Sequence, residues 1–285
     1  MEIKTSDASG FPSIQRGRGR LLIALDLDGT LTNSEKKITP KTKDALMEAQ
    51  ERGVRIVLAS GRPTYGIMPV AEELELERHG GFILAFNGGK IVDCKTRKVV
   101  FEHKLDPDVV PVLYHETMRV GLQILVHQGA EIVATSSEDR YVKLEAGINK
   151  MSIVQCDDFL NQITYPINKC LIVGEPAPLC ALEQRILKLL EGRISAYRSM
   201  DNFLECVPLG IDKGHSLKRL AATLGIDREE IIACGDSYND VGMIKFAGLG
   251  VAMANAPRDI QEIADVVTLS NDNDGVAQVV EKYVL

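Results

Sequence analysis

Two groups of acidic residues have a spacing that suits metal-assisted chemistry. Asp26 and Asp28 are separated by one residue, and Asp236 and Asp240 form a second group far along the chain. Carboxylates held close together repel one another, which raises the pKa of at least one of them unless a cation offsets the repulsion. A divalent cation such as Mg²⁺ takes oxygen ligands and would keep such carboxylates ionised. The two groups therefore predict a divalent-metal site, with Mg²⁺ as the expected ion.

Both acidic groups follow stretches that have the character of buried strands. Residues 21–25 are apolar on both faces, which is typical of a strand inside a parallel sheet, and residues 231–235 predict a second such strand. The carboxyl ends of parallel strands meet at one edge of an open sheet, where ligands bind. Asp26 and Asp236 are therefore expected to lie at the same edge.

A serine and a lysine occupy positions in the predicted fold that are comparable to those of Asp26 and Asp236. Ser60 follows a predicted strand at 54–59 and precedes a helix start, whose backbone N–H groups attract anions. Lys213 opens a predicted helix at 213–224. Taken singly, each of these residues has a structural explanation. Ser60 suits the role of a helix cap, Lys213 suits that of a solvated surface charge, and a lone aspartate after a strand is usually a helix N-cap. Taken together, they indicate a phosphate-binding site.

The order of predicted elements defines the fold class. Strands alternate with helices at both ends of the chain, which predicts an α/β fold with a Rossmann-like parallel sheet covered by helices on both faces. The middle of the chain alternates less regularly and predicts an inserted α+β cap domain. We therefore expect a core at 21–89 and 204–285, a cap at 90–203, and a flexible N-terminal extension at 1–20.

Composition narrows the classes of partner. The chain has 285 residues, is 45% hydrophobic, and carries 33 basic against 40 acidic residues, a formal net charge of −7. This charge gives no basic field for nucleic acid or an anionic membrane, and no apolar run approaches the roughly 20 residues of a membrane span. Six cysteines without a CxxC pair predict reduced thiols and a cytoplasmic location. Oligomeric state is left open.

The motifs, in their order along the chain, resemble those of the haloacid dehalogenase superfamily of phosphohydrolases. Within it, the chain resembles the Cof-type sugar-phosphatase branch, which carries a large cap between the second and third motifs. The resemblance extends from Leu21 to the C-terminus. The segments that carry it are Asp26–Thr30, Ser60–Arg62, Asn87–Gly88, Lys213–Gly214, Gly235–Asp240 and Met253–Ala256.

This resemblance implies a covalent mechanism. Asp26 would be the nucleophile that forms an aspartyl-phosphate, and Asp28 would donate a proton to the leaving group and later accept one from water. Magnesium would be held by the carboxylates of Asp26 and Asp236 and by the backbone carbonyl of Asp28, with Asp240 bonding its waters. Lys213 and Ser60 would hold the phosphate oxygens, while Asn239 would orient Lys213 or the phosphate. The full set of expected phosphate and substrate contacts is Ser60, Gly61, Arg62, Asn87, Lys213 and Asn239, of which Arg62 and Asn87 equally suit local turn or capping roles.

The expected function is that of a magnesium-dependent phosphatase of small phosphomonoesters, with sugar phosphates as the favoured class. A phosphomutase of the same superfamily is the alternative within the enzymes, and a non-catalytic phospho-acceptor module is the alternative outside them. The insert is expected to act as a lid that excludes water, hinged near 88–90 and 203–208. Glu205, beside the second hinge, is a candidate for facing the site.

Overall fold

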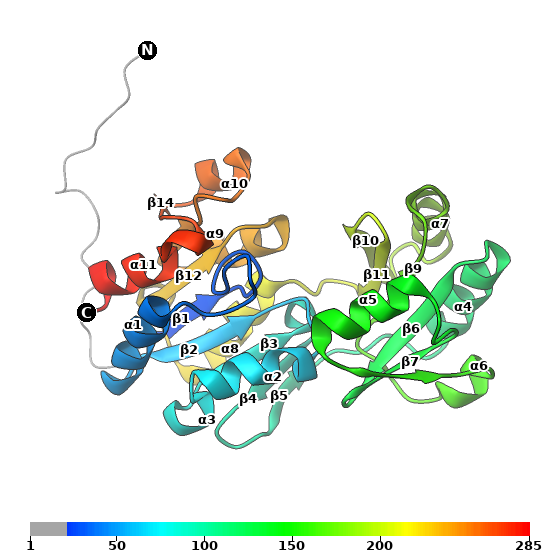
Figure 1. Cartoon of the computed structure of the whole chain (residues 1–285), viewed down its shortest axis with the longest axis horizontal. Coiled ribbons are helices and arrows are strands. Elements are labelled where there is room, and N and C mark those ends of the chain that lie inside the picture. The colour runs from blue at the N-terminus through cyan, green and yellow to red at the C-terminus, as the bar shows by residue number, and fades with distance from the viewer. Residues whose placement is uncertain (1–21) are drawn as a thin grey trace, which may run out of the picture.

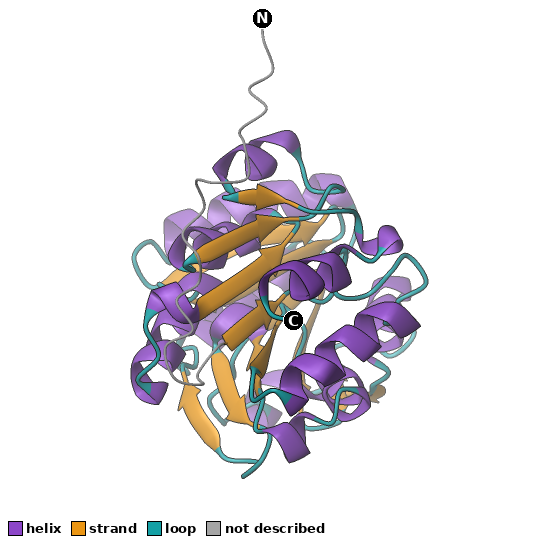
Figure 2. Cartoon of the chain, turned by 90° about the vertical axis from the view of Figure 1, so that its left-hand side faces the viewer, coloured by secondary structure: helices purple, strands orange, loops and turns teal. Residues whose placement is uncertain are grey.

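The computed structural model describes residues 22–285, so the extension predicted at 1–20 lies outside the described residues. Two β-sheets, each with its own helices, make up this part of the chain, and they lie side by side (Figure 1). Within the described range, no helix is long and apolar enough to cross a membrane. The predicted α/β class is confirmed, because a mainly parallel sheet lies between helical layers (Figure 2).

The first sheet has eight strands in the order β14-β13-β12-β1-β2-β3-β4-β5. Strands β14 to β3 run parallel, and β3, β4 and β5 pair antiparallel as a meander at one edge. Its strands are β1 (Leu22–Leu25), β2 (Arg55–Ala59), β3 (Phe82–Ala85), β4 (Lys90–Asp93), β5 (Val99–Glu102), β12 (Ile231–Gly235), β13 (Leu249–Ala252) and β14 (Val266–Val267).

Helices cover both faces of this sheet, as the apolar strands require. In β1, Ile23 and Leu25 pack toward the first layer, and Leu22 and Ala24 pack toward the second, in keeping with the two-residue period of a strand. The first layer holds α1 (Pro40–Glu51), α2 (Thr64–Glu73), α3 (Leu76–His79) and α11 (Gly275–Tyr283), and the second holds α8 (Lys213–Leu224) and α9 (Val241–Phe246). Helix α10 (Arg258–Ile263) packs with α9 and β13 in a smaller cluster.

The second sheet has six strands in the order β10-β11-β9-β6-β7-β8. Helices α4 and α7 pack on one face and α5 on the other. Its elements are α4 (Val109–Arg119), β6 (Gln123–Gln128), β7 (Glu131–Ala134), α5 (Arg140–Asn149), β8 (Ser152–Gln155), α6 (Phe159–Gln162), β9 (Cys170–Val173), α7 (Pro176–Leu189), β10 (Ile194–Met200) and β11 (Phe203–Pro208).

Strand membership corrects the boundaries predicted at 90 and 203. Strands β4 and β5 extend the first sheet, and β11 belongs to the second. The chain crosses between the sheets at Lys104, because the His103 N–H still bonds Gly89 and the Leu105 N–H already bonds Ile167. We call residues 22–103 and 209–285 the core and residues 104–208 the cap.

The six cysteines differ in their exposure. All six are unpaired, and five are buried, but Cys180 is exposed on α7. Burial raises the pKa of Cys234 to about 12, so this thiol is protonated and unreactive at neutral pH.

Candidate active site

The edge formed by β1 and β12 brings Asp26 and Asp236 together. The two strands pair in parallel with Leu25 beside Cys234, and the Asp26 N–H donates to the Cys234 carbonyl at 3.1 Å. Each acid follows the last residues of its strand, so both lie at the carboxyl edge of the sheet. The position predicted for these two residues is therefore the one that the structure shows.

Lys213 lies between two carboxylates at this edge. Its Nζ is 2.5 Å from Asp26 Oδ1 and 2.6 Å from Asp240 Oδ1. The side chains of Lys213 and Asp240 are fully buried. An ammonium buried with two short ionic contacts is held in one position, which is what stabilisation of a developing negative charge requires.

The start of α8 explains how the lysine reaches the site. Asp212 caps the helix by accepting the His215 N–H at 2.8 Å, which makes Lys213 the first helical residue. The next residue, Gly214, lies against Gly242 of α9 so closely that a Cβ atom would be 2.4 Å from the Gly242 carbonyl carbon. This close approach of α8 and α9 sets Lys213 beside Asp240.

Negative charge exceeds positive charge at this edge of the sheet. Burial and the neighbouring Asp240 raise the pKa of Asp26 well above its usual value, although Lys213 acts in the opposite direction. Burial and Asp240 likewise raise the pKa of Asp236, against the hydrogen bond from Thr30. The same negative surroundings outweigh burial at Lys213, whose pKa is raised, so it is ionised. One lysine therefore does not offset this many carboxylates.

The three carboxylates fit a divalent metal ion. One oxygen from each of Asp26, Asp236 and Asp240 lies within 4.8 Å of the others, and an all-oxygen donor set suits a hard cation. Asp240 Oδ1 accepts from Lys213, and its Oδ2 accepts from the N–H groups of Asp236 and Ser237 at 3.1 and 2.9 Å. Since both Asp240 oxygens are occupied, the oxygens best able to bind a metal directly belong to Asp26 and Asp236.

The turn after β1 also helps to position the Asp236 side chain. Thr30 Oγ1 donates to Asp236 Oδ1 at 2.7 Å. Gly29 has a φ of +89°, and a Cβ there would lie 2.5 Å from Asp236 Oδ2, so only glycine fits. Sequence reasoning recognised the motif that contains Thr30 but assigned this residue no role.

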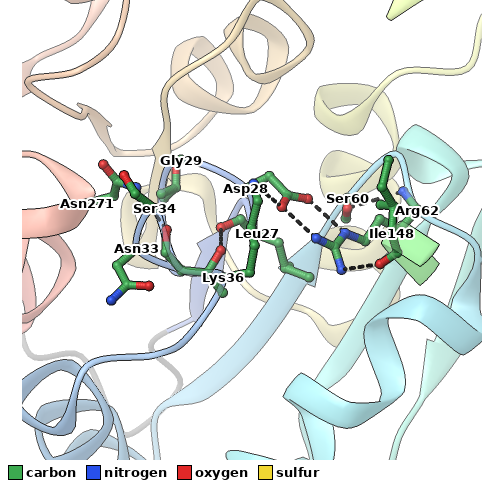
Figure 3. Close-up of polar contacts among 12 residues, drawn as sticks. Leu27, Asp28, Gly29, Asn33, Ser34, Lys36, Ser60, Arg62, Ile148 and Asn271 are labelled. Atoms are coloured by element: carbon green, nitrogen blue, oxygen red, sulfur yellow. Dashed lines mark hydrogen bonds and ion pairs between the residues drawn. The ribbon is translucent and has the colours of Figure 1, made fainter. Parts of the chain in front are cut away.

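Asp28 does not point into the carboxylate group but pairs with basic side chains. Arg62 holds it in a bidentate pair, with Nε 2.8 Å from Oδ2 and a terminal nitrogen 2.6 Å from Oδ1, and Lys36 Nζ lies 2.9 Å from Oδ1 (Figure 3). Burial alone would raise the pKa of Asp28, but the hydrogen bonds and charges of Arg62 and Lys36 outweigh it and lower this pKa. The carboxylate is therefore ionised here. No motif indicated Lys36.

Arg62 also contacts the cap. Its other terminal nitrogen lies 3.5 Å from the carbonyl oxygen of Ile148, in the last turn of α5 (Figure 3). The Arg62 N–H donates to Ser60 Oγ at 3.2 Å, which fixes the buried serine at the end of β2. The loop that carries Ser60 and Arg62 thus touches both Asp28 and the cap.

Asn87 links the loops of the core with the cap. It accepts from Asn239 Nδ2 at 3.0 Å and donates to the Tyr197 hydroxyl of the cap at 2.7 Å. Gly61 lies against it, since a Cβ at Gly61 would be 3.2 Å from the Asn87 amide. Asn239 was expected to orient Lys213 or the phosphate, but the contact with Lys213 is made by Asp240.

Comparisons with known proteins identify the family. The sequence model of the haloacid dehalogenase-like hydrolases matches residues 23–280. The chain belongs to this family. YxeH of Bacillus subtilis, which carries a provisional phosphatase name, is 32% identical over 93% of this chain and 98% of its own. The 5-amino-6-(5-phospho-D-ribitylamino)uracil phosphatase YcsE of the same organism is 30% identical over 93% of this chain and 96% of its own.

A solved structure extends the likeness to the fold. The crystal structure of a haloacid dehalogenase-like hydrolase from Bacteroides thetaiotaomicron is 51% identical, with a TM-score of 0.90 over 92% of this chain and 99% of that one. The protein is accordingly a phosphoric monoester hydrolase of the Cof type, and its family generally uses a divalent metal. The resemblance inferred from the motifs is confirmed.

Proposed function

We propose that the protein is a magnesium-dependent phosphatase that hydrolyses small, hydroxyl-rich phosphomonoesters through an aspartyl-phosphate on Asp26. The observation that carries this proposal is the buried contact of Lys213 with Asp26 and Asp240, beside Asp236 at the ends of β1 and β12. Together these groups supply a nucleophile, a fixed positive charge and a set of carboxylates that needs a cation.

In the first step, an Asp26 carboxylate oxygen attacks phosphorus, and the bond from phosphorus to the ester oxygen breaks. The departing alkoxide takes a proton from Asp28. In the second step, water gives a proton back to Asp28 and attacks phosphorus, which breaks the acyl-phosphate bond and releases inorganic phosphate.

Asp28 needs a proton before it can act as an acid. In the structure it is ionised by its contacts with Arg62 and Lys36. A substrate phosphate is an anion that competes for the same two cations, because guanidinium and ammonium groups bind phosphate well. Exchange of these contacts on substrate binding would remove the groups that lower the pKa of Asp28 and allow it to be protonated.

Magnesium would be held by Asp26 and Asp236, with the Asp28 carbonyl as the third protein ligand and Asp240 bonding its waters. When bound, the ion would offset the repulsion between the Asp26 carboxylate and the phosphate. Ser60 and Lys213 would bind the non-bridging oxygens of the phosphate. The Ser60 hydroxyl remains able to donate, since the described contact to its oxygen comes from the Arg62 N–H.

The proposed substrate class follows from the cap and from one relative. The cap contacts the loops that carry Arg62 and Asn87 and so covers this edge of the sheet, which favours a compact leaving group over a macromolecule. The relative YcsE is named for a phosphate ester of a ribityl chain, which is a polyol. A phosphomutase would also need a second phosphate acceptor, and no contact in the described residues favours it.

The test follows inorganic phosphate released by the purified full chain from a panel of phosphorylated sugars and polyols. We expect many turnovers per protein molecule with Mg²⁺ and none after EDTA. Undiminished release in metal-free buffer would contradict the metal assignment. A bisphosphate activator that converts phosphate release into isomerisation of the substrate would identify a mutase instead.

A further inference from the structure

A row of polar side chains crosses one face of the cap sheet. Tyr197 of β10 lies directly opposite Glu205 of β11, and Glu205 lies opposite Leu171 of β9. Residues that alternate along a strand share a face, so Lys169, two residues before Leu171, lies on the face of Glu205. In the next strand, β6, Val126 pairs with Cys170, which places His127 beside Lys169.

This row lies against the core loops of the active site. The Tyr197 hydroxyl accepts from Asn87 Nδ2 at 2.7 Å, and Lys169 Nζ is 3.5 Å from the Gly61 carbonyl oxygen. The His127 ring centroid is 6.1 Å from that of Phe86. Because Gly61 and Asn87 belong to the loops after β2 and β3, the row borders the place where a leaving group would extend from the phosphate.

The charges of the row are buried but loosely paired. Only 3% of the Lys169 side chain and 8% of the Glu205 side chain are exposed. Burial of an ion costs several kcal/mol and is usually offset by short, numerous hydrogen bonds. Here Tyr197 and Lys169 both approach Glu205 Oε2 at 3.4 Å, near the outer limit for a hydrogen bond. Among the described residues, Glu205 Oε1 receives no hydrogen bond.

His127 adds an acceptor without a partner. Burial outweighs the neighbouring carboxylates and lowers the pKa of His127, so its ring is neutral at pH 7. The ring pairs through Nε2 with Glu145 Oε1 at 2.8 Å, and since Glu145 is a carboxylate, Nε2 carries the proton. This leaves Nδ1 as an acceptor, and within residues 22–285 this buried atom has no hydrogen-bond partner.

We propose that Tyr197, Glu205, Lys169 and His127 form the site that recognises hydroxyl groups on the leaving group of the substrate. The inference rests on the proposed phosphatase function and defines its substrate class as polyhydroxy phosphomonoesters. A hydroxyl group both donates and accepts hydrogen bonds. It can therefore donate to Glu205 or His127 and accept from Lys169 at the same time. An alkyl or aryl leaving group cannot, and it would leave buried charges poorly paired, which a site of this kind penalises strongly.

The test compares two substrates of equal phosphate charge with the full chain and Mg²⁺: D-ribose 5-phosphate and p-nitrophenyl phosphate. The quantity measured is the ratio of their kcat/KM values. In Glu205→Gln, which keeps the side-chain volume and removes the charge, we expect this ratio to fall roughly 10- to 100-fold, as for loss of a charged hydrogen bond. Tyr197→Phe removes one oxygen, and we expect a fall of about 10-fold.

Glu116→Gln is the matched control. Glu116 pairs with Arg119 and Arg185 on α4 and α7, on the other face of the cap sheet, so its loss should not change the ratio. Thermal unfolding of each variant checks that it folds. If Glu205→Gln does not fold, Tyr197→Phe tests the inference on its own.

The outcomes separate the inference from the function on which it rests. If Glu205→Gln and Tyr197→Phe both release phosphate with the wild-type ratio, the row only joins cap to core and the inference is wrong, while the phosphatase function stands. If the wild-type chain releases phosphate from neither substrate, the proposed function itself fails and the inference fails with it.

Discussion

The core and the cap each bury a lysine that contacts a carboxylate, but they hold it very differently. In the core, Lys213 lies 2.5 and 2.6 Å from two carboxylates. In the cap, Lys169 lies 3.4 Å from Glu205 and 3.5 Å from a core carbonyl oxygen. Both lysine side chains are almost fully buried, so the difference is not one of solvent exposure.

The difference indicates a division of labour between the two regions. Short contacts from rigid elements fix a charge where bonds to phosphorus form and break, since a preorganised site needs no rearrangement during the reaction. Long contacts leave hydrogen-bonding capacity for a ligand that supplies better ones. Changes in the core should therefore stop chemistry with every substrate, whereas changes in the cap should alter the preference among substrates.

The largest expected effect is that of Asp26→Asn. An amide is no nucleophile, so turnover of every substrate should fall by about 10⁴-fold or more, the range seen when a covalent nucleophile is removed. Phosphate release assays measure this loss. Asp44→Asn, at an exposed position of α1, is the matched control and should keep wild-type rates. Near-normal turnover by Asp26→Asn would contradict the covalent mechanism.

The second effect concerns the metal and can be measured without turnover. Magnesium should raise the thermal unfolding midpoint by about 5 °C at a concentration ~100-fold above its Kd, because it binds only the folded carboxylate group. Asp236→Asn should lose this shift. An equal shift in Asp236→Asn and the wild-type chain would show that the ion binds elsewhere.

The raised pKa values give this prediction a pH dependence with a defined sign. Asp26 and Asp236 have folded-state pKa values above those of the unfolded chain. Their contribution to metal-free stability is therefore present at acidic pH and is lost as the pH rises through the raised values. Metal-free wild-type protein should lose stability over this pH range, and metal-free Asp236→Asn should lose less. Mg²⁺ should reduce the difference between these two proteins.

Asp28→Asn should have the third largest effect. It removes the proton donor and keeps the backbone carbonyl, so the rate should fall about 100-fold while the magnesium-induced rise in the unfolding midpoint remains. Steady-state kinetics and thermal unfolding with and without Mg²⁺ measure the two parts. If the rate did not change, the proton-transfer role would belong to another group.

The core site could be predicted from the sequence because its residues follow local rules. Asp26, Ser60 and Asp236 each come directly after a strand, and parallel strands bring their carboxyl ends to one edge. Asp240 and Asn239 could not be told apart in this way, because adjacent residues of one turn point in different directions. The boundary at 90 was misplaced because the pattern of β4 and β5 predicts strands without showing which sheet they join.

The polar row of the cap could not be predicted at all from local pattern. Tyr197 lies on β10, Glu205 lies on β11 and Lys169 directly precedes β9. They become neighbours only through the strand order β10-β11-β9. That order depends on packing between segments distant in sequence. Glu205 was suspected from its place near the hinge, but nothing in the sequence indicated that Tyr197 would bond the core residue Asn87.

The smallest expected effect concerns the ion pair of Lys36 with Asp28, within the core. Lys36 is 60% exposed in its pair with Asp28, and exposed ion pairs contribute less than about 1 kcal/mol, so Lys36→Gln should leave stability almost unchanged. Lys36 helps to lower the pKa of Asp28, after the larger contribution of Arg62, so its removal should raise that pKa. An acid acts only when protonated, and a higher pKa keeps it protonated to higher pH.

The pH profile of kcat/KM measures this shift. In Lys36→Gln the alkaline limb of this profile should move to higher pH, because the Asp28 pKa is no longer lowered by Lys36. Lys37→Gln is the control, because Lys37 pairs with Glu35 and makes no contact with Asp28. A limb that moves to lower pH, or moves equally in both variants, would mean that the Asp28 side chain does not donate the proton. The ion pair that Lys36 and Arg62 make with Asp28 would then serve only to hold the loop of Arg62 against the cap.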